Sequence, residues 1–224
     1  MTAFERAWNE AFGVRRPGRI VCVGRNYAAH VEEQAAELPP EPLLFAKLPN
    51  TIVGPGEPIL LPPESSHVDA EAELALVIAA PARRVPPERV AGVLAGYTAA
   101  NDVSARDLQY GDGQWFRGKG FDTFCPLGPE VVPLPSLEPA LAVRQLLNGT
   151  VLQEGNTRDF IFGIPTLVAA VSNVLTLERG DVILTGTPEG VGYFREPRVA
   201  LAGGDLVEVH VEGAPPLSNP VAAG

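Results

Sequence analysis

The chain has 224 residues, of which 46% are hydrophobic and 20% charged, a composition typical of a globular protein that can bury a sizeable core. Its formal net charge of -10 argues against a nucleic-acid partner, because affinity for phosphate backbones comes from lysine and arginine. No apolar run approaches the length of a membrane span, and the acidic start is unlike a signal peptide, so we expect a cytoplasmic protein with no membrane partner.

The N-terminal third predicts two short helices and one strand. Thr2 and Glu5 match a capping box, and three aromatic residues at intervals of four give the first helix one apolar face. A Pro-Gly pair ends that helix at residue 17. The apolar run 20–24, IVCVG, predicts a strand, and a loop and a second helix follow in residues 25–38.

The run HVDAEAELALVI, residues 67–78, predicts a strand that enters the core. Its carboxylates Asp69, Glu71 and Glu73 occupy every second position, so they share one face of the strand. The alternate positions carry alanine, leucine and isoleucine. A carboxylate row therefore points into a region where charge is costly.

The remaining pattern predicts many short strands and few helices. Residues 86–94 predict a helix, and the next strand ends at Asp102. Asn148-Gly149 predicts a tight hairpin, residues 165–175 a helix, and two Gly-Asp pairs near the end predict turns that feed strands. With no βαβ alternation, the sequence predicts a single α+β domain over residues 1–224 that is mainly β with a few helices.

Glu71 and Glu73 form the first candidate site. Two partly desolvated carboxylates this close repel each other unless a cation lies between them, and a hard divalent cation prefers such oxygens. Asp102 is the natural third ligand, and the set suits an open octahedral Mg²⁺ or Mn²⁺ site. A solvated strand face and a paired-carboxylate glycosidase are the alternatives. The apolar residues that follow, and the common direction of both carboxylates, favour the metal.

His30, Glu33 and Lys119 are the next candidates. His30 and Glu33 stand at i and i+3 of a predicted helix, so the carboxylate can orient the imidazole as a general base for water; a surface pair is the alternative. Lys119 lies between two glycines, which let the backbone approach a ligand, and it is either an oxyanion-stabilising residue or a solvated loop lysine. His67 and His210 lack such partners and are predicted to be structural or exposed to solvent.

Two further motifs predict no chemistry. Cys22 and Cys125 lack metal or redox spacing and sit among apolar residues, so we expect buried, reduced thiols. The glycine-rich run 185–192 lacks the Walker lysine and the dinucleotide-binding spacing, so nucleotide binding is not expected.

Seven segments follow one another between about residue 20 and the end of the chain: VGRNYAAHVEE, FAKLPN, VDAEAELALVI, NDVSARDLQ, RGKGFDTFCPLGP, LLNGTVLQEGNTRDFIFGIPTLV and ILTGTPEGVG. This ordered set resembles the fumarylacetoacetate hydrolase family, in its bacterial acylpyruvase and 2-hydroxyhepta-2,4-diene-1,7-dioate isomerase-like branch. The resemblance implies a roll of mixed β-sheets around the site, and a homodimer. The N-terminal helix, within residues 1–17, lies outside this core, where we expect it to pack or to form a dimer contact.

The resemblance also implies roles for individual residues. Mg²⁺ or Mn²⁺ would be held by Glu71, Glu73 and Asp102, and water would be activated by His30 and Glu33 on a segment that can order over the substrate as a lid. The residues matching positions near the developing oxyanion are Lys119 and Gln109. Those matching positions near the substrate carboxylate or oxo groups are Arg25, Lys47, Arg106 and Thr187.

Two departures from the family pattern bear on the pocket. Ala70 stands where relatives often have a bulkier residue, which would leave the pocket roomier. Leu48 stands where a proline is common, which weakens the placement of Lys47.

The family acts on 2-oxo acids and their enols, so the resemblance implies a metal-dependent enzyme of aromatic catabolism with a small 2-oxo acid substrate. The first hypothesis is a C–C hydrolase of the acylpyruvate or fumarylpyruvate type, in which His30 deprotonates water for attack on the distal carbonyl and the enolate of pyruvate departs. Decarboxylation of an oxo-diacid such as oxaloacetate and isomerisation of a hydroxydienedioate need the same site, and the sequence does not choose among them. A metal-stabilised binding module is the non-enzyme alternative. His30, Glu33 and Lys119 argue against it, because a structural cation needs no base beside it.

Overall fold

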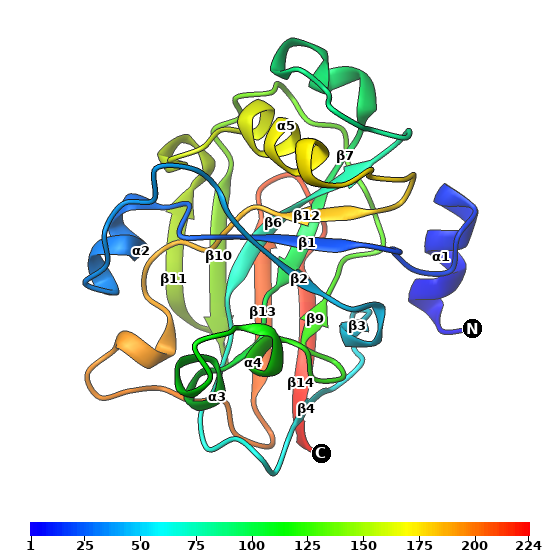
Figure 1. Ribbon diagram of the computed structural model, residues 1–224. Helices are drawn as coiled ribbons and strands as arrows, with labels where there is room; N and C mark the ends of the chain where they lie inside the picture. Colours follow the sequence, from blue (N-terminus) through cyan, green and yellow to red (C-terminus); the bar gives the residue numbers. More distant parts are fainter.

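The computed structural model describes residues 1–224, and two five-stranded sheets form its body (Figure 1). The first sheet contains β1 (Ile20–Gly24), β2 (Leu43–Lys47), β6 (Ala72–Ile78), β7 (Leu94–Asn101) and β12 (Val182–Leu184), in the order β2-β1-β12-β6-β7. The second contains β4 (Ile59–Leu61), β10 (Ala142–Leu147), β11 (Thr150–Asn156), β13 (Leu206–Val211) and β14 (Leu217–Ala223), in the order β11-β10-β13-β14-β4.

Shorter elements connect the two sheets. Two small ladders pair β3 (Ile52–Val53) with β9 (Cys125–Pro126) and β5 (Val68–Asp69) with β8 (Ser104–Ala105). The α-helices are α1 (Ala3–Phe12), α2 (Ala28–Glu33), α3 (Arg106–Gly111), α4 (Phe116–Lys119) and α5 (Ile164–Val174). The 3-10 helices are η1 (Pro49–Thr51), η2 (Pro87–Val93), η3 (Thr157–Asp159) and η4 (Gly192–Phe194). None of these helices has the length and apolar character needed to cross a bilayer.

Both large sheets are mixed, which confirms the fold class expected from the sequence. In the first sheet β1 runs parallel to β12 and antiparallel to β2. In the second sheet β14 runs parallel to β4 and antiparallel to β13. The chain is therefore α+β, with helices at the margins of a β roll (Figure 1).

The strand β6 is the centre of the core because it is buried on both faces. Leu74 and Leu76 belong to the main hydrophobic cluster, which also takes in residues of β7, β10, β13 and α5. Ala75 and Val77, on the alternate face, belong to a second cluster with residues of α1, β1 and β12. Burial on both faces explains why LALVI reads as an uninterrupted apolar run.

The N-terminal helix α1 packs on the second cluster. The capping box predicted at Thr2 and Glu5 is present, and the aromatic face made by Phe4, Trp8 and Phe12 is buried. This packing is one of the two roles expected for the helix. A contact with a second copy, and the homodimer itself, remain predictions.

Several other sequence predictions are confirmed. Asn148 and Gly149 both have positive φ, 51° and 79°, as a two-residue hairpin of the primed type requires. The helix α5 begins and ends within one residue of its expected bounds. Cys22 and Cys125 are buried and unpaired, and burial raises the pKa of the Cys125 thiol to about 12.

The strand expected over residues 67–78 is interrupted, which corrects the prediction. Ala70 and Glu71 separate β5 from β6. The N–H of Glu71 donates to Oδ1 of Asn101 at 2.9 Å, and the next N–H donates to Oε1 of Gln153 at 2.9 Å. Side-chain amides thus replace ladder hydrogen bonds where the carboxylates enter the site.

The helix expected over residues 86–94 is also corrected, because this segment forms the 3-10 helix η2. Only Val90 within it is buried, so the segment has no continuous apolar stripe to hold α-helical turns against the core.

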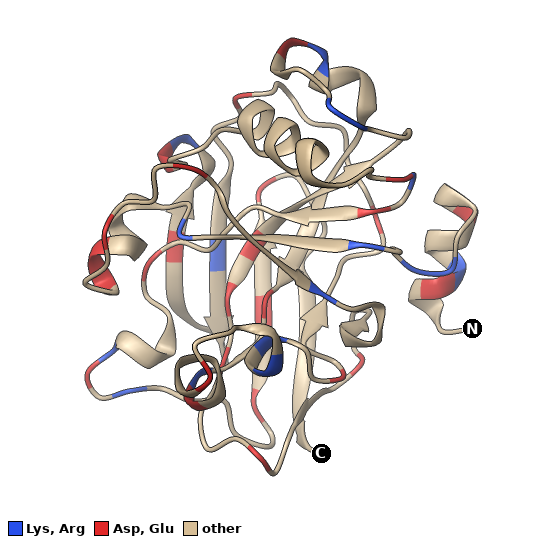
Figure 2. Cartoon of the chain, viewed as in Figure 1, with Lys and Arg blue, Asp and Glu red and all other residues tan.

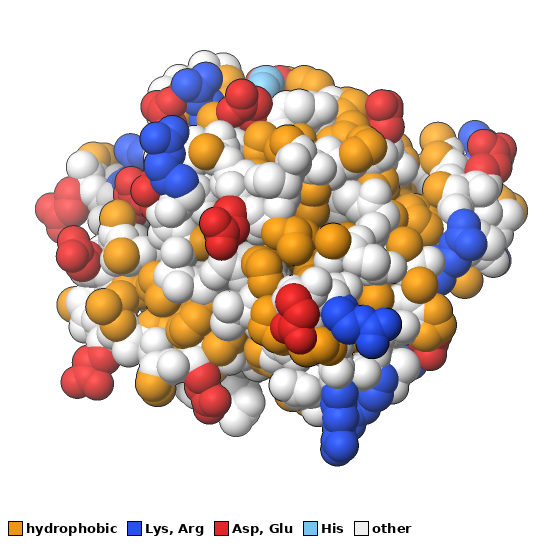
Figure 3. All heavy atoms as spheres, turned by 90° about the horizontal axis from the view of Figure 1, so that it is seen from above, with side chains coloured by type: hydrophobic (Ala, Val, Ile, Leu, Met, Phe, Trp, Pro, Cys, Tyr) orange, Lys and Arg blue, Asp and Glu red, His pale blue; other side chains and the backbone are white.

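Charged side chains occur inside the fold as well as at its margins, a distribution that composition alone does not show. Figure 2 shows acidic residues around the margins and also on strands in the middle of the fold. On the face seen in Figure 3, acidic and basic side chains lie among hydrophobic atoms. The charges inside the fold are the better indication of function, because burying charge is costly.

Replacing Leu76 by alanine tests the position of the core. Leu76 is 0% exposed, so Leu76→Ala should lower the free energy of unfolding by about 2–5 kcal/mol, measured by urea denaturation. Val174→Ala is the matched control, because Val174 is 68% exposed at the end of α5 and should change stability by less than about 0.5 kcal/mol. Equal effects of the two substitutions would contradict the placement of β6.

Candidate active site

Four carboxylates meet where β6 and β7 pair. Asp69 ends β5, Glu71 lies in the interruption, and Glu73 is the second residue of β6. The antiparallel register of β6 and β7 brings Asp102, which directly follows β7, to the same place. One oxygen each from Glu71, Glu73 and Asp102 lie within 4.8 Å of one another, and all three residues are buried.

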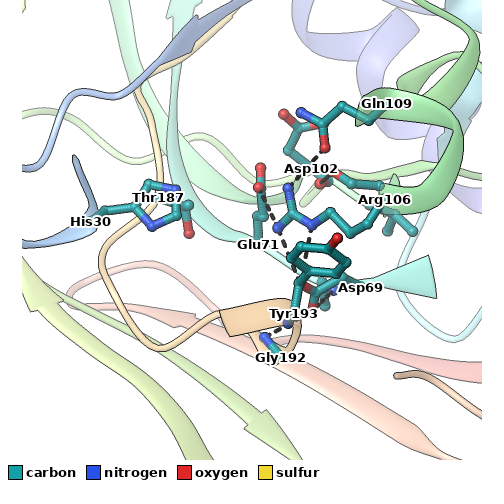
Figure 4. A network of polar contacts seen from close by, with 12 residues as sticks. His30, Asp69, Glu71, Asp102, Arg106, Gln109, Thr187, Gly192 and Tyr193 are labelled. Atoms are coloured by element: carbon teal, nitrogen blue, oxygen red, sulfur yellow. Dashed lines mark hydrogen bonds and ion pairs between the residues drawn. The ribbon is translucent and has the colours of Figure 1, made fainter. Parts of the chain in front are cut away.

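Three buried cations offset most of this charge. Lys119 Nζ lies 2.7 Å from Glu71 Oε2 and 2.6 Å from Asp102 Oδ2. Arg106 Nη2 lies 2.7 Å from Glu71 Oε1 and 3.1 Å from Asp69 Oδ2 (Figure 4). Lys47 Nζ lies 2.8 Å from the second oxygen of Asp102, Oδ1. With all four carboxylates ionised, the three cations leave one negative charge uncompensated.

That charge belongs to Glu73, which forms no salt bridge and accepts one hydrogen bond, from the N–H of Gly186 at 2.7 Å. Burial raises the pKa of Glu73 well above its usual value, and the neighbouring charges of Asp102 and Glu71 raise it further. Burial acts on Glu71 in the same direction, but the charges of Lys119 and Arg106 outweigh it and hold the pKa of Glu71 low.

These residues fit a divalent cation. Asp102 Oδ1 is close to Lys47 Nζ, but the angles of that contact are not those of a hydrogen bond, so this buried oxygen has no hydrogen-bond partner. Glu73 adds a carboxylate with no counter-ion. Hard cations such as Mg²⁺ and Mn²⁺ are bound by carboxylate oxygens of this kind. The acidic triad can therefore hold a divalent metal.

A small cavity lies beside the triad. Its walls include the apolar side chains of Val23, Phe45 and Trp115. The predicted site residues that also line it are Arg25, His30, Arg106, Gln109, Lys119 and Thr187, together with the triad. The cavity measures ≈ 20 Å³, enough for a group about the size of one water molecule. A substrate of several atoms therefore needs side chains around the cavity to move.

The pair His30 and Glu33 is formed as the helical spacing predicts. His30 Nδ1 lies 3.0 Å from Glu33 Oε2, and Glu33 Oε1 accepts the N–H of Gly190 at 2.9 Å. The imidazole is 3% exposed. Figure 4 shows His30 and Thr187 on one side and Asp102, Gln109 and Arg106 on the other.

Gln109 and Thr187 both line the cavity, but they differ in whether a hydrogen-bonding group is left for a ligand. Gln109 Oε1 accepts from Arg106 Nη1 at 3.0 Å, so its amide nitrogen remains available as a donor. The Thr187 hydroxyl donates to the carbonyl of Ala72 at 2.9 Å and accepts from Gln153 at 2.8 Å. Thr187 therefore contributes shape more than a free polar group.

The resemblance implies a position near the substrate for Lys47, and the structure places its ammonium against Asp102 rather than in the cavity. Lys47 is 2% exposed and does not line the cavity. Its ammonium donates to the carbonyls of Val103, Lys119 and Phe124 at 3.0, 2.6 and 2.8 Å. Lys47 thus forms an ion pair with Asp102 and, through these carbonyls, joins the end of β7 to α4.

Gly118, which precedes Lys119, was expected to let the backbone approach a ligand, but in the structure it allows close packing of two segments. A Cβ on Gly118 would lie 2.8 Å from the carbonyl oxygen of Ala105 and 2.8 Å from the backbone nitrogen of Gln109. Gly118 therefore permits α4 to pack against α3, and this packing brings Lys119 to the triad.

Sequence reasoning missed two residues of the site. Asp69 accepts from the N–H groups of Gly192 and Tyr193, each at 3.0 Å, and so ties η4 to Arg106. Its alternation with Glu71 was the available signal, but the partners lie far along the chain. Gln34 stands four residues after His30, a spacing that places both on one helical face.

Comparison with known proteins supports the assignment. A family model described as fumarylacetoacetate (FAA) hydrolase C-terminal matches residues 19–222. The mitochondrial oxaloacetate tautomerase Fahd2a of Rattus norvegicus is 44% identical over 211 residues, covering 93% of this chain and 67% of the rat protein.

Two solved structures are also similar. A 5-carboxymethyl-2-hydroxymuconate delta-isomerase from Mycobacterium smegmatis has a TM-score of 0.83 and 46% identity, covering 93% of this chain and 80% of its own. A 2-hydroxyhepta-2,4-diene-1,7-dioate isomerase from Mycobacterium marinum has a TM-score of 0.82 and 42% identity, covering 92% of this chain and 75% of its own.

The chain spans 66% to 68% of the length of the vertebrate tautomerases it matches. Because those relatives are named mitochondrial, the cytoplasmic location expected from the sequence stays a prediction. The family match covers most of the chain, and the tautomerases and isomerases that resemble it are enzymes. The chain is therefore an enzyme, and it belongs to the fumarylacetoacetate hydrolase family.

Proposed function

We propose that the enzyme transfers a proton between carbon and oxygen in a short 2-oxo dicarboxylic acid, as in the keto–enol tautomerisation of oxaloacetate. The names of the curated relatives support oxaloacetate, and those of the two structural neighbours support isomerisation of related enolic dicarboxylic acids. The observation that carries the proposal is geometric: a single imidazole, that of His30, faces the carboxylate–cation cluster across a small cavity (Figure 4).

We assign a divalent cation, Mg²⁺ or Mn²⁺, to Glu71, Glu73 and Asp102. When bound, such a cation would orient the carboxylate and 2-oxo oxygens of a substrate and draw electron density from the carbonyl. With such a cation bound, the four carboxylates and three buried cations would carry a net positive charge, and Arg25 adds a further cation to the wall. The cavity would then attract a dianion.

The protein's own groups account for the proton transfer. His30 accepts a proton from C3 of the 2-oxo acid, and the electron pair of the C–H bond moves toward the 2-oxo oxygen. Burial opposes the charge on Lys119, but the charges of Asp102 and Glu71 outweigh this and raise its pKa, so it stays an ammonium that can stabilise the oxygen's negative charge. The Gln109 amide nitrogen is a second donor. Return of the proton to oxygen gives the enol.

The fate of the proton separates the related reactions. Return to a more distant carbon of a dienol would give isomerisation of a hydroxydienedioate, in the sense of the Mycobacterium marinum neighbour's name. Hydrolysis of a C–C bond in an acylpyruvate is the second candidate function, because the carboxylate-oriented imidazole of His30 is also a suitable base for water. Decarboxylation of an oxo-diacid needs no base and uses only the remainder of the site.

The first test is an assay that separates these reactions. Oxaloacetate is added as its enol with Mg²⁺, the loss of enol absorbance is followed, and pyruvate is measured separately. We expect the enzyme to accelerate enol loss without forming pyruvate, and EDTA to abolish the acceleration. Formation of pyruvate in step with enol loss would indicate a decarboxylase, and activity on an acylpyruvate alone would indicate a hydrolase; either would overturn the proposal.

The second test concerns the metal ligands. Mg²⁺ or Mn²⁺ at about 100 times its dissociation constant should stabilise the wild-type fold by about 2.7 kcal/mol, seen as a rise in Tm. In Glu73→Gln this rise should disappear, while the metal-free variant should be at least as stable as the wild type because an unpaired buried charge is removed. Glu154→Gln, in an exposed pair with Arg144, is the control. A rise of the same size in Glu73→Gln would refute the ligand assignment.

The third test concerns the base. His30→Ala should lower kcat for tautomerisation by roughly 10²- to 10⁴-fold while leaving the metal-dependent rise in Tm intact. His210→Gln is the control, because His210 lies on β13, away from the cavity, and should retain full activity. Wild-type turnover in His30→Ala would mean that another group moves the proton.

A further inference from the structure

The side chain of Gln34 makes the shortest polar contact of the catalytic imidazole. Its Nε2 lies 2.6 Å from His30 Nε2, the ring nitrogen that does not face Glu33. We propose that Gln34 is a positioning residue, which fixes the tautomer of His30 and opposes retention of a proton on Nε2. The inference rests on the proposed role of His30 as the base.

The orientation of the Gln34 amide is set by Arg25. Arg25 Nε lies 3.1 Å from Gln34 Oε1. A guanidinium has only donors, so the amide oxygen must face Arg25 and the amide NH₂ must face His30. Arg25 itself has a left-handed backbone, with φ 57°, a conformation uncommon outside glycine.

The direction of the remaining hydrogen bonds then follows. Because the Gln34 NH₂ donates, His30 Nε2 must accept and cannot carry the proton. The proton of the neutral ring is therefore on Nδ1, where it donates to Glu33 Oε2 at 3.0 Å. Glu33 Oε1 accepts from the N–H of Gly190, so every member of the chain has a suitable partner.

The surroundings leave the imidazole few alternatives. His30 is 3% exposed, so bulk water does not compete for its nitrogens. The ring of Phe194, in η4, packs edge-on to it with a centroid separation of 6.3 Å. Gln34 is thus the only polar side chain that contacts Nε2, and it lines the same cavity as His30.

This arrangement has a consequence for a reversible proton transfer. A substrate must displace the Gln34 amide to reach Nε2, in agreement with the small volume of the cavity. Once Nε2 has accepted a proton, it carries an N–H group. The Gln34 amide, whose oxygen is held by Arg25, can return only with its NH₂ toward that N–H, so two donors would face each other. The returning amide therefore favours release of the proton to the product and resets the neutral base.

The tautomer can be observed directly, without substrate. The chain has three histidines, so ¹⁵N-histidine labelling with long-range ¹H–¹⁵N spectra, assigned with His67→Gln and His210→Gln, isolates the ring signals of His30. We expect the Nδ1–H tautomer in the wild type and a mixture of tautomers in Gln34→Leu. Glu32→Gln, an exposed change on the same helix, should give the wild-type spectrum.

A variant with a carboxylate at position 34 reverses the direction of the hydrogen bond to His30. In Gln34→Glu the carboxylate can only accept, so Arg25 and His30 must both donate to it, and His30 should bear protons on both nitrogens at neutral pH. The kcat of Gln34→Glu should then fall roughly 100-fold, with a smaller change in KM, because the imidazole that acts as the base is already protonated.

The possible results separate the two proposals. An Nε2–H tautomer in the wild type, or an unchanged spectrum in Gln34→Leu, would overturn the positioning role of Gln34 whatever the activity. The expected spectra together with a lack of tautomerase activity would support that role and reject the reaction proposed for the site.

Discussion

The burial of four carboxylates in one place is the constraint on which the site depends. Three buried cations compensate Asp69, Glu71 and Asp102, and Glu73 is left without one. An uncompensated buried carboxylate is strongly unfavourable, so it either takes up a proton or binds a cation. A divalent metal would satisfy Glu73 and make the cavity positive, and this would link the stability of the fold to attraction of an anionic substrate.

The fold holds these charges with contacts that reach across the sequence. The antiparallel register of β6 and β7 sets Asp102 beside the glutamates. Lys47, from β2, pairs with Asp102 and is itself held by three backbone carbonyls. Asp69 joins the same cluster to η4 through two backbone N–H groups. The segment whose Phe194 packs against His30 is therefore tied to the carboxylates, so the acidic triad and His30 belong to one connected unit.

Local patterns were sufficient for part of this description. The Asn148-Gly149 hairpin, the capped first helix and the alternation of Glu71 with Glu73 follow from short-range rules, and the structure contains them. The break between β5 and β6 could not be foreseen, because it depends on amide side chains from distant elements. The inward position of Lys47 could not be foreseen either, because a lysine that binds buried carbonyls and one that faces a substrate look alike in sequence.

The most direct test of the charge argument is a titration of the protein with Mn²⁺ followed by electron paramagnetic resonance, with and without oxalate as a planar analogue of a 2-oxo acid enolate. The account predicts one tightly bound Mn²⁺ per chain, whose spectrum changes when oxalate binds beside it. Absence of a tight site, or a bound ion whose spectrum ignores oxalate, would contradict the claim that the buried carboxylates hold a metal facing the substrate.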